Sequence, residues 1–211
     1  MWWALMLAMV AQDGLQERVL REKTRVYMIE VRYPEIPKAG AFNRAVHDAV
    51  DPVVKRFQSQ DVAEGLPEGA ASGTLRSRYT AVSLRSGIIS VLLDWSEYDP
   101  GAAHPWSAQV SVNYDSRAGR VLGLRDLFLP GSDSVRRLSE LAIADLMKRE
   151  YAVEDMVRQG AGPVESNFKV FTLTETALVL YFPQYQVAPG VVGNEKVEIP
   201  LATLAPLLRP R

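Results

Sequence analysis

Acidic side chains near the ends of predicted strands are the residues whose type and spacing could support catalysis. A pair of carboxylates can hydrolyse a glycosidic bond when both flank one cleft. Most of the acidic residues here flank turns, where Asp is common because its carboxylate accepts backbone hydrogen bonds. We therefore interpret them as turn residues or solvated faces, and keep a carboxylate enzyme using Asp94, Asp99 or Asp115 as an alternative. The available acids are Asp94, Glu97, Asp99, Asp115 and Asp126.

Other catalytic patterns are missing from the sequence. A catalytic zinc site takes about three protein ligands, but the two histidines, His47 and His104, lie far apart and form no HExxH motif. There is no cysteine, which excludes thiol catalysis and thiolate metal sites. The nucleophile motif GxSxG and the phosphate-binding glycine patterns do not occur. We predict no catalytic residue, no metal ligand and no cofactor.

Two loops constrained by Gly and Pro carry aromatic rings. They are residues 98–106 (YDPGAAHPW) and 181–192 (YFPQYQVAPGVV). Constrained loops and aromatic side chains are favoured where proteins recognise other molecules. The alternative is that Trp106 starts a strand and packs into the core while His104 caps a turn, and that Tyr185 and Val187 of the second loop are packing residues. The predicted binding residues are Tyr98, His104, Trp106 and Tyr185.

Composition places the chain among globular proteins and argues against nucleic acid as a partner. The 211 residues are 47% hydrophobic and 23% charged, enough for one large domain or two small halves that share a core. The 24 basic residues nearly cancel the 25 acidic ones, so no broad positive field faces phosphate groups. Oligomeric state does not follow from these numbers.

An apolar run opens the chain. Residues 2–11 (WWALMLAMVA) are too few to span a bilayer as a helix, but they have the length of a secretory signal core. Ala8 and Ala11 lie near a plausible cleavage point. We predict that residues 1–12 are a signal peptide and that the domain is exported to the periplasm or secreted. The alternative is an N-terminal strand or an anchor. We predict contact with a membrane only if this N-terminal segment is not cleaved.

The remaining chain divides into two predicted halves, residues 23–118 and 119–211. In the first half, a polar lead-in (16–22) precedes a strand that begins at Thr24. Pro34 and Pro37 end this strand, and Asn43 caps the helix that follows. A loop at 61–73 leads to an antiparallel meander. In the second, a long helix precedes three strands and a short helix. The predicted ranges are strands 74–84, 88–98 and 106–114, then a helix from 132–134 to about 151, a linker 158–167, strands 168–173, 177–182 and 196–199, and a helix 201–208.

The predicted fold class is α+β: two α+β halves with mainly antiparallel sheets, a helix packed on each sheet and a short helix closing the chain. A set of segments in this order resembles the RsiV/PdaC-type extracytoplasmic domain family over residues 26–208. The segments are YPEI (33–36) before Phe42-Asn43, GAAHP (101–105), NYD (113–115) with Gly119, LRDLF (124–128), LVLYF (178–182), YQVAPG (185–190) and VEIP (197–200) with Leu204.

The resemblance implies a cell-envelope domain. In one branch of the family it is the extracellular region of an anti-sigma factor that senses lysozyme by binding it; in another it precedes a peptidoglycan deacetylase. The sequence contains neither a sigma-binding segment nor the deacetylase metal motif. The expectation is a non-enzymatic, exported binding module whose partner is a lysozyme-like protein or a wall glycan. Alternatives are a carboxylate-dependent enzyme or accessory domain acting on envelope polysaccharide, and a scaffold with an exposed apolar patch.

Overall fold

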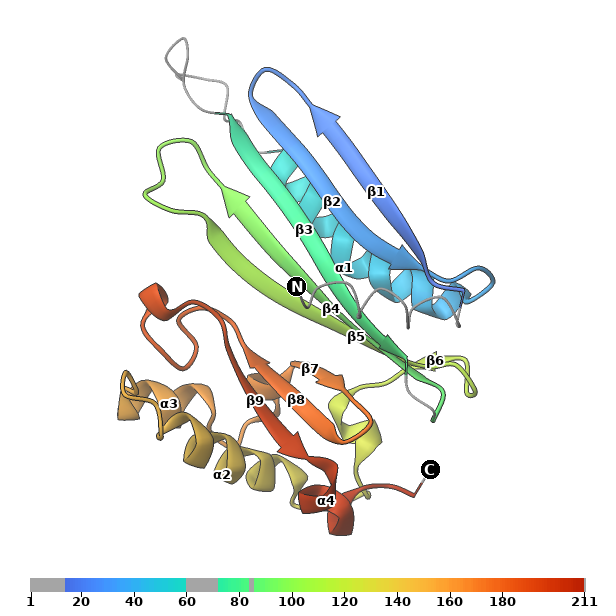
Figure 1. The fold of residues 1–211 in the computed structure, drawn as a ribbon, viewed down its shortest axis with the longest axis vertical. Coiled ribbons are helices and arrows are strands. Elements are labelled where there is room, and N and C mark those ends of the chain that lie inside the picture. The colour runs from blue at the N-terminus through green and yellow to red at the C-terminus, as the bar shows by residue number, and fades with distance from the viewer. Residues whose placement is uncertain (1–13, 60–71, 84–85, 211) are drawn as a thin grey trace, which may run out of the picture.

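A six-stranded sheet and a three-stranded sheet form the frame of the computed structural model (Figure 1). The structure describes residues 14–59, 72–83 and 86–210. The predicted signal peptide (1–12) and most of the predicted loop 61–73 lie outside the described residues. Within the described ranges, no helix is long and apolar enough to cross a membrane.

The large sheet follows the chain order from β1 to β6. Neighbouring strands are antiparallel except β2 and β3, which are parallel because helix α1 (Gly40–Gln58) connects them. The predicted meander of β3, β4 and β5 is therefore present, and the α+β class is confirmed, with one parallel step that the sequence did not indicate. The strands are β1 Gln16–Lys23, β2 Tyr27–Glu35, β3 Gly73–Ser83, β4 Ile88–Tyr98, β5 Trp106–Asp115 and β6 Arg120–Val121.

The predicted lead-in at 16–22 is wrong, because these residues form strand β1. Most of its side chains are exposed, so it lacks the alternation by which a half-buried strand is recognised. Charged side chains are typical of edge strands, where they discourage further pairing. Strand β2 also continues through Pro34 to Glu35, since its ladder with β3 ends at Val31 and no β3 partner requires the missing N–H.

Helix α1 covers one face of the large sheet (Figure 1). It begins at Gly40, and the predicted cap Asn43 lies inside its first turns. Asn43 instead braces the preceding loop: its Oδ1 accepts from the Ile36 N–H (2.9 Å) and its Nδ2 donates to the Ile36 carbonyl (3.0 Å). The apolar face of the helix packs against the inner side chains of β2 to β5. The buried helix residues are Phe42, Val46, Val50, Val54 and Phe57.

The second half builds a smaller sheet with helices on its outer side. The predicted long helix ends at Leu146 rather than near Tyr151, and a separate helix begins at Glu154, overlapping the predicted linker. The elements are η2 Leu124–Leu127, α2 Ser134–Leu146, α3 Glu154–Gly160, η3 Glu165–Phe168, β7 Val170–Leu173, β8 Ala177–Phe182, η4 Gly190–Val192, β9 Glu195–Pro200, α4 Leu201–Leu204 and η5 Ala205–Leu207.

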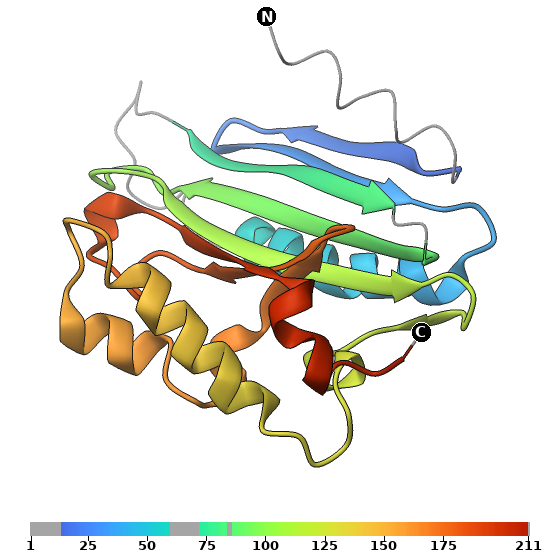
Figure 2. The ribbon, with the colours of Figure 1, turned by 60° about the horizontal axis from the view of Figure 1, so that its bottom comes forward.

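Polar side chains join the two sheets. Strand β7 lies against β4 and β5, and Figure 2 shows the small sheet beneath these strands with α2 and α3 on its far side. Ser90 and Ser111 accept hydrogen bonds from the Leu173 and Phe171 N–H groups (2.9 and 3.0 Å), and Asn113 Nδ2 donates to the Phe171 carbonyl (2.9 Å). The free edge of β7 is thus satisfied by side chains of the large sheet.

Candidate binding groove

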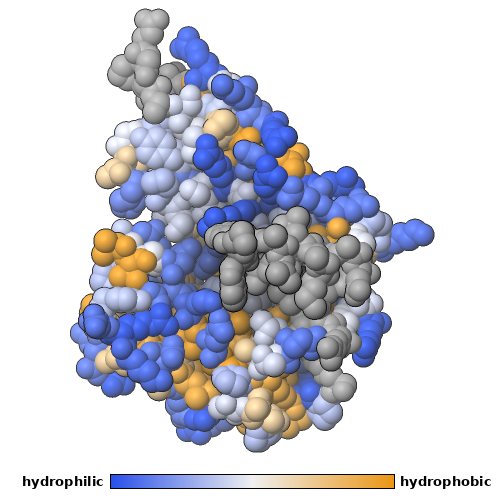
Figure 3. Space-filling view, in the orientation of Figure 1, coloured by the Kyte–Doolittle hydropathy of each residue, from blue (hydrophilic) through white to orange (hydrophobic). Residues whose placement is uncertain are grey.

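A groove of about 580 Å³ lies on the face of the large sheet that points away from α1. It crosses β2, β3, β4 and β5 and reaches the loop between β8 and β9. In the space-filling view of this side, hydrophilic residues predominate over the strands that remain visible (Figure 3). Its lining residues are Glu30, Arg32, Arg76, Ser77, Arg78, Asp94, Trp95, Ser96, Ser107 and Asn194.

The strand register sets the groove side chains in two rows across the sheet. In the first row, Arg76 lies between Glu30 and Ser96, and Ser96 lies opposite Ser107. The row continues to Asn194, whose Oδ1 is 3.4 Å from the Ser107 Oγ. Adjacent strands are about 4.8 Å apart, so four side chains cover about 14 Å. The second row consists of Arg78, Asp94 and Gln109.

The groove lies where β2 and β3 separate. Their ladder ends at the pair Val31 and Ser77, and the two strands diverge beyond it (Figure 1). The buried Ser77 replaces the missing ladder: its Oγ accepts from the Arg32 N–H (3.0 Å) and donates to the Arg32 carbonyl (2.9 Å). A single serine therefore allows the sheet to open without leaving backbone groups unsatisfied.

The charges of the groove are unevenly paired. Arg32 contacts Glu30 (2.7 Å) and Glu17 (2.9 Å), and Arg21 also contacts Glu30 (3.3 Å). Hydrogen bonds from Arg32 and then Arg21 hold the pKa of Glu30 below its ordinary value, so this carboxylate stays ionised.

Two further arginines on the same face have no such partner. Arg76 and Arg78 are exposed and form no ion pair or side-chain hydrogen bond with any residue that the structure describes. They were not predicted as site residues from the sequence. The alternation of Leu75, Arg76, Ser77, Arg78 and Tyr79 indicates which side chains share a face. It does not indicate which residues of other strands lie beside them.

The predicted binding residues occupy different surfaces. Trp106 is 49% exposed and lies opposite Glu97, on the face that α1 covers, whereas its neighbour Ser107 points to the groove side. Tyr98 is half-buried on the groove side of β4, and His104 is exposed in the β4–β5 loop with its Nδ1 3.2 Å from the Pro105 carbonyl. The structure thus separates Trp106 from the groove.

Tyr185 lies in the loop that closes one end of the groove. Its side chain is 56% exposed and its backbone has a φ of 71°, which is strained for a residue other than glycine. The ring lies over Gly190, where any Cβ would collide with it. Gln184 ties the loop together, since its N–H donates to Asn194 Oδ1 (2.9 Å) and its Nε2 to the Gly190 carbonyl (2.6 Å). The loop therefore holds an exposed aromatic ring in a fixed place.

The candidate catalytic carboxylates do not gather in one cleft. Asp94 lines the groove, where its Oδ1 accepts from Gln109 Nε2 (2.7 Å), whereas Glu97 is buried on the α1 face and bonded to Arg56. Asp99 is exposed at the β4–β5 turn, and Asp115 accepts from two N–H groups of the turn that follows β5. No cluster of metal-ligating side chains occurs in the part of the chain that the structure describes.

Asp126 lies outside the groove, near the start of the second half. Burial favours its neutral form, but hydrogen bonds from the Gly123 N–H (2.8 Å) and the Arg120 side chain outweigh this and lower its pKa. Asp126 therefore stabilises a turn and does not line the groove.

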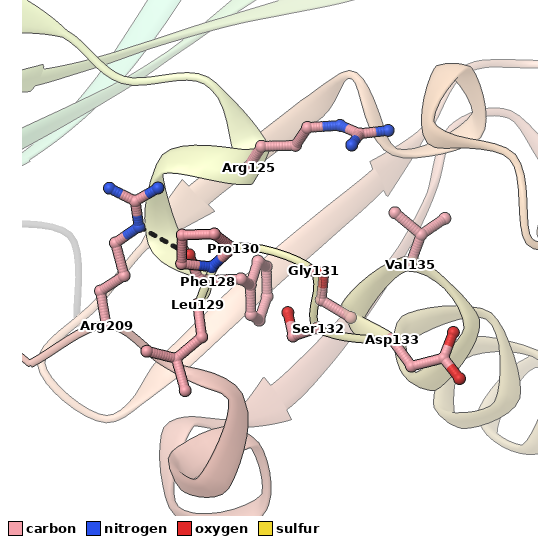
Figure 4. Close-up of a pocket in the computed structure, with 10 residues that line it drawn as sticks. Arg125, Phe128, Leu129, Pro130, Gly131, Ser132, Asp133, Val135 and Arg209 are labelled. Atoms are coloured by element: carbon pink, nitrogen blue, oxygen red, sulfur yellow. Dashed lines mark hydrogen bonds between the residues drawn. The ribbon is translucent and has the colours of Figure 1, made fainter.

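A second pocket of about 480 Å³ lies between η2, the start of α2 and the C-terminal segment (Figure 4). Its two arginines are engaged: Arg125 Nε pairs with Glu165 (2.5 Å), and Arg209 Nε donates to the Phe128 carbonyl (2.7 Å). Asp133 is paired with Arg136. The charged groups of this pocket are thus engaged within the fold, although the buried Ser132 Oγ has no hydrogen-bond partner among the described residues. The unpaired arginines of the groove on the large sheet favour that groove as the binding site.

Comparison with known proteins finds similarity to a family of unknown function, a peptidoglycan deacetylase and an esterase. The family model described as "Protein of unknown function (DUF3298)" matches residues 125–202. The chain is 25% identical over 187 residues to the peptidoglycan-N-acetylmuramic acid deacetylase PdaC of Bacillus subtilis, a match that covers 88% of this chain and 40% of that protein. It is also 25% identical over 118 residues to an esterase of Mycobacterium tuberculosis, covering 56% of this chain and 51% of the esterase. The chain thus spans about half the length, or less, of these relatives.

Solved structures share the fold over nearly the whole chain. A DUF3298 family protein of Pseudomonas aeruginosa has a TM-score of 0.66 at 16% identity, covering 94% of this chain and 96% of that one. A DUF3298 family member from Bacteroides fragilis has a TM-score of 0.60 at 14% identity, covering 93% of each. Together with the match at residues 125–202, the likeness to PdaC confirms the predicted resemblance to the PdaC-type extracytoplasmic domain family.

Proposed function

We propose that this domain is a non-catalytic, exported module of the cell envelope that binds a wall glycan in the groove. The likeness to a protein named for its action on peptidoglycan supports the choice of ligand class. The main support for this proposal is the two rows of polar side chains across β2 to β5, because they offer many hydrogen-bonding groups along one open groove. Sugars present hydroxyl groups in such a linear array.

The composition of the groove favours a glycan over a protein partner. The centre of a protein interface is depleted of charged residues, whereas this groove is lined by three arginines and two carboxylates. Tyr185, held rigidly at the adjacent loop, supplies an aromatic face on which a sugar ring can pack.

The groove offers little for catalysis. Its two lining carboxylates, Glu30 and Asp94, are two strands and two residues apart, which places their Cα atoms about 12 Å from each other. The lowered pKa of Glu30 is the opposite of what a general acid needs. A carboxylate-dependent enzyme acting on envelope polysaccharide is therefore the less favoured function.

One feature favours the second candidate, a lysozyme-like protein as the partner. Val191 is 95% exposed, and an apolar patch appears at the place of η4 (Figure 3). Together with Tyr185 it forms the kind of apolar and aromatic projection that enters a partner's pocket. This surface adjoins the groove, so the two candidates can be separated by changing one surface at a time.

Co-sedimentation with purified peptidoglycan tests the proposal. Ser96→Trp places a large ring in the middle of the first row and should weaken binding at least tenfold. Val153→Trp makes a similar change at an exposed position just before α3, outside the groove, and should leave binding unchanged. Equal binding by both variants would remove the groove from the site.

Two other results would favour the alternatives. If peptidoglycan does not retain the domain but a lysozyme does, and Val191→Asp abolishes that capture, the protein partner replaces the glycan. Release of soluble sugar that depends on Asp94 would identify an enzyme.

A further inference from the structure

We infer that Arg76 and Arg78 form an anion site within the groove, so that the ligand is a negatively charged wall glycan bearing a carboxylate or phosphate. This inference rests on the proposed function and adds the chemical class of the ligand. The two side chains leave the same face of β3 two residues apart, which separates their Cα atoms by about 7 Å.

The acidic neighbours that should neutralise these arginines are bonded elsewhere. Glu30 lies directly opposite Arg76 in the register, but it is bonded to Arg32 and Arg21. Asp94 lies directly opposite Arg78, but it forms no ion pair with Arg78 and accepts a hydrogen bond from Gln109. Opposite charges across neighbouring strands normally pair and stabilise a sheet. Neither Glu30 nor Asp94 forms an ion pair with these arginines, which leaves the two guanidinium groups available.

A third arginine lines the same groove. Arg32 follows the last ladder pair of β2 and β3, but its guanidinium group is paired with Glu30 and Glu17, so Arg76 and Arg78 supply the unpaired positive charge. Like charges side by side disfavour the folded state unless an anion is bound between them. A guanidinium group binds carboxylate or phosphate oxygens through paired N–H donors, a geometry that an ammonium group does not offer.

The position of the site in the row indicates how the ligand lies. Arg76 is in the same row as Ser96, Ser107 and Asn194, which offer neutral hydrogen-bonding groups. A glycan chain placed along this row would bring an acidic substituent to the β3 end and its hydroxyl groups to the β5 end. The groove would then distinguish charged from neutral glycans.

The test compares Arg76→Gln/Arg78→Gln with a control that removes the same charge elsewhere. Glutamine keeps a polar side chain on an exposed surface, so the fold should be preserved, as circular dichroism and thermal unfolding would verify. The control is Arg44→Gln/Lys55→Gln, two exposed cations on α1. We expect the groove double variant to bind purified peptidoglycan at least tenfold more weakly at low salt, with a smaller dependence on salt, and the control to bind as the wild type does.

Modified ligands identify the source of the negative charge. Walls stripped of phosphate polymers by hydrogen fluoride test phosphate, and walls whose carboxylates are amidated with carbodiimide test the carboxylates. Weaker binding to one of these preparations identifies the group removed from it as the anion that the groove binds. Unchanged binding to both overturns the inference.

The groove variants separate this inference from the proposed function. If Ser96→Trp abolishes binding but the double glutamine variant binds with unchanged affinity, the groove takes a neutral glycan and the anion site is wrong. If neither variant weakens binding, or if the wild-type domain does not bind the wall, both proposals fail.

Discussion

The two ends of one sheet face use polar side chains for opposite purposes. At one end, Ser90, Ser111 and Asn113 point from β4 and β5 to the backbone of β7 and are fully engaged. At the other end, Arg76 and Arg78 point from β3 into an open groove and contact no partner in the described ranges. A polar residue on a sheet face is therefore structural or available for binding according to what covers it.

At the covered end, side chains of β4 and β5 take the place of a neighbouring strand beside β7. Strand β7 is the edge of the small sheet and would otherwise bury unpaired N–H and carbonyl groups. Ser90 Oγ also donates to Asn113 Oδ1 (2.5 Å), so the two residues orient each other before they contact β7. Such a buried, satisfied network fixes the position of the small sheet against the large one.

The largest expected effect comes from breaking the covered end. Asn113→Ala removes a side chain that is 1% exposed, so the Phe171 carbonyl loses this donor and the Ser90 hydroxyl loses its acceptor, while Ser90 still accepts from the Leu173 N–H. We expect the free energy of unfolding to fall by about 3 kcal/mol, as measured by urea denaturation. Ser96→Ala, at the open end of the same face, should change it by less than about 0.5 kcal/mol. Equal costs for the two variants would contradict the contrast between the two ends.

The next effect compares arginines on the two faces. Arg56 contacts the buried Glu97 on the α1 face with both terminal nitrogens, and this contact raises the pKa of Arg56. Arg56→Ala would remove a positively charged partner of the buried Glu97 carboxylate. Since Arg56 is half exposed, we expect a loss of about 2 kcal/mol rather than the full cost of a buried pair. Arg76→Ala should cost less than about 0.5 kcal/mol.

Thermal and urea unfolding of both variants measure this difference. A loss of stability in Arg76→Ala comparable to that of Arg56→Ala would mean that Arg76 has a structural partner. It would remove the argument for a free guanidinium group in the groove.

Local patterns in the sequence predicted the elements that bury one face. The apolar stripe of α1 and the alternation of β3 are direct consequences of packing one face against a core, whereas β4 is an apolar run that is buried on both faces in its first half. Strand β1 was missed because an exposed edge strand has no such pattern, and the end of α2 was placed too late because the helical residues of α3 follow it closely. The parallel step between β2 and β3 depends on which sheet edge the chain returns to after α1, and no local pattern encodes this.

The candidate site was predictable only in part. The glycine and proline residues around Tyr185 indicated a constrained loop, but the exposure of its ring is seen only in the structure. The groove itself joins residues of four strands to Asn194, which is 87 positions away from its contact Ser107. Register across a sheet cannot be obtained from one strand at a time, so Arg76 and Arg78 could not be placed beside Asp94 and Glu30.

A smaller effect on stability is expected at the loop beside the open end. Gly190→Ala would place a Cβ within 2.0 Å of the Tyr185 ring carbon Cζ. The new Cβ would displace the ring, which is already 56% exposed, further into solvent, so we expect a loss of less than about 1 kcal/mol but several-fold weaker glycan binding. Gly40→Ala, where the Cβ meets only the tip of Arg44 at 3.4 Å, is the matched control. Unchanged binding by Gly190→Ala would mean that Tyr185 is not part of the site.

The smallest effect concerns the charge balance of the open end. Glu30 has a lowered pKa because Arg32 and then Arg21 donate hydrogen bonds to it. A carboxylate whose pKa is depressed by folding stabilises the protein above its unfolded pKa, and this contribution is lost as the pH falls through the lower, folded value. Glu30→Gln should therefore make the decline in stability below about pH 4 shallower than in the wild type.

The same variant sharpens the proposed anion site at neutral pH. Without the carboxylate of Glu30, Arg32 loses a partner in the groove and its guanidinium group becomes more available beside Arg78. We expect Glu30→Gln to bind an anionic wall glycan about twofold more tightly, because one negative charge near the ligand is removed. Glu140→Gln removes the same charge from α2, outside the groove, and should not alter binding. Weaker binding by Glu30→Gln would instead mean that Glu30 accepts hydrogen bonds from the ligand, and the groove would then recognise hydroxyl groups more than anions.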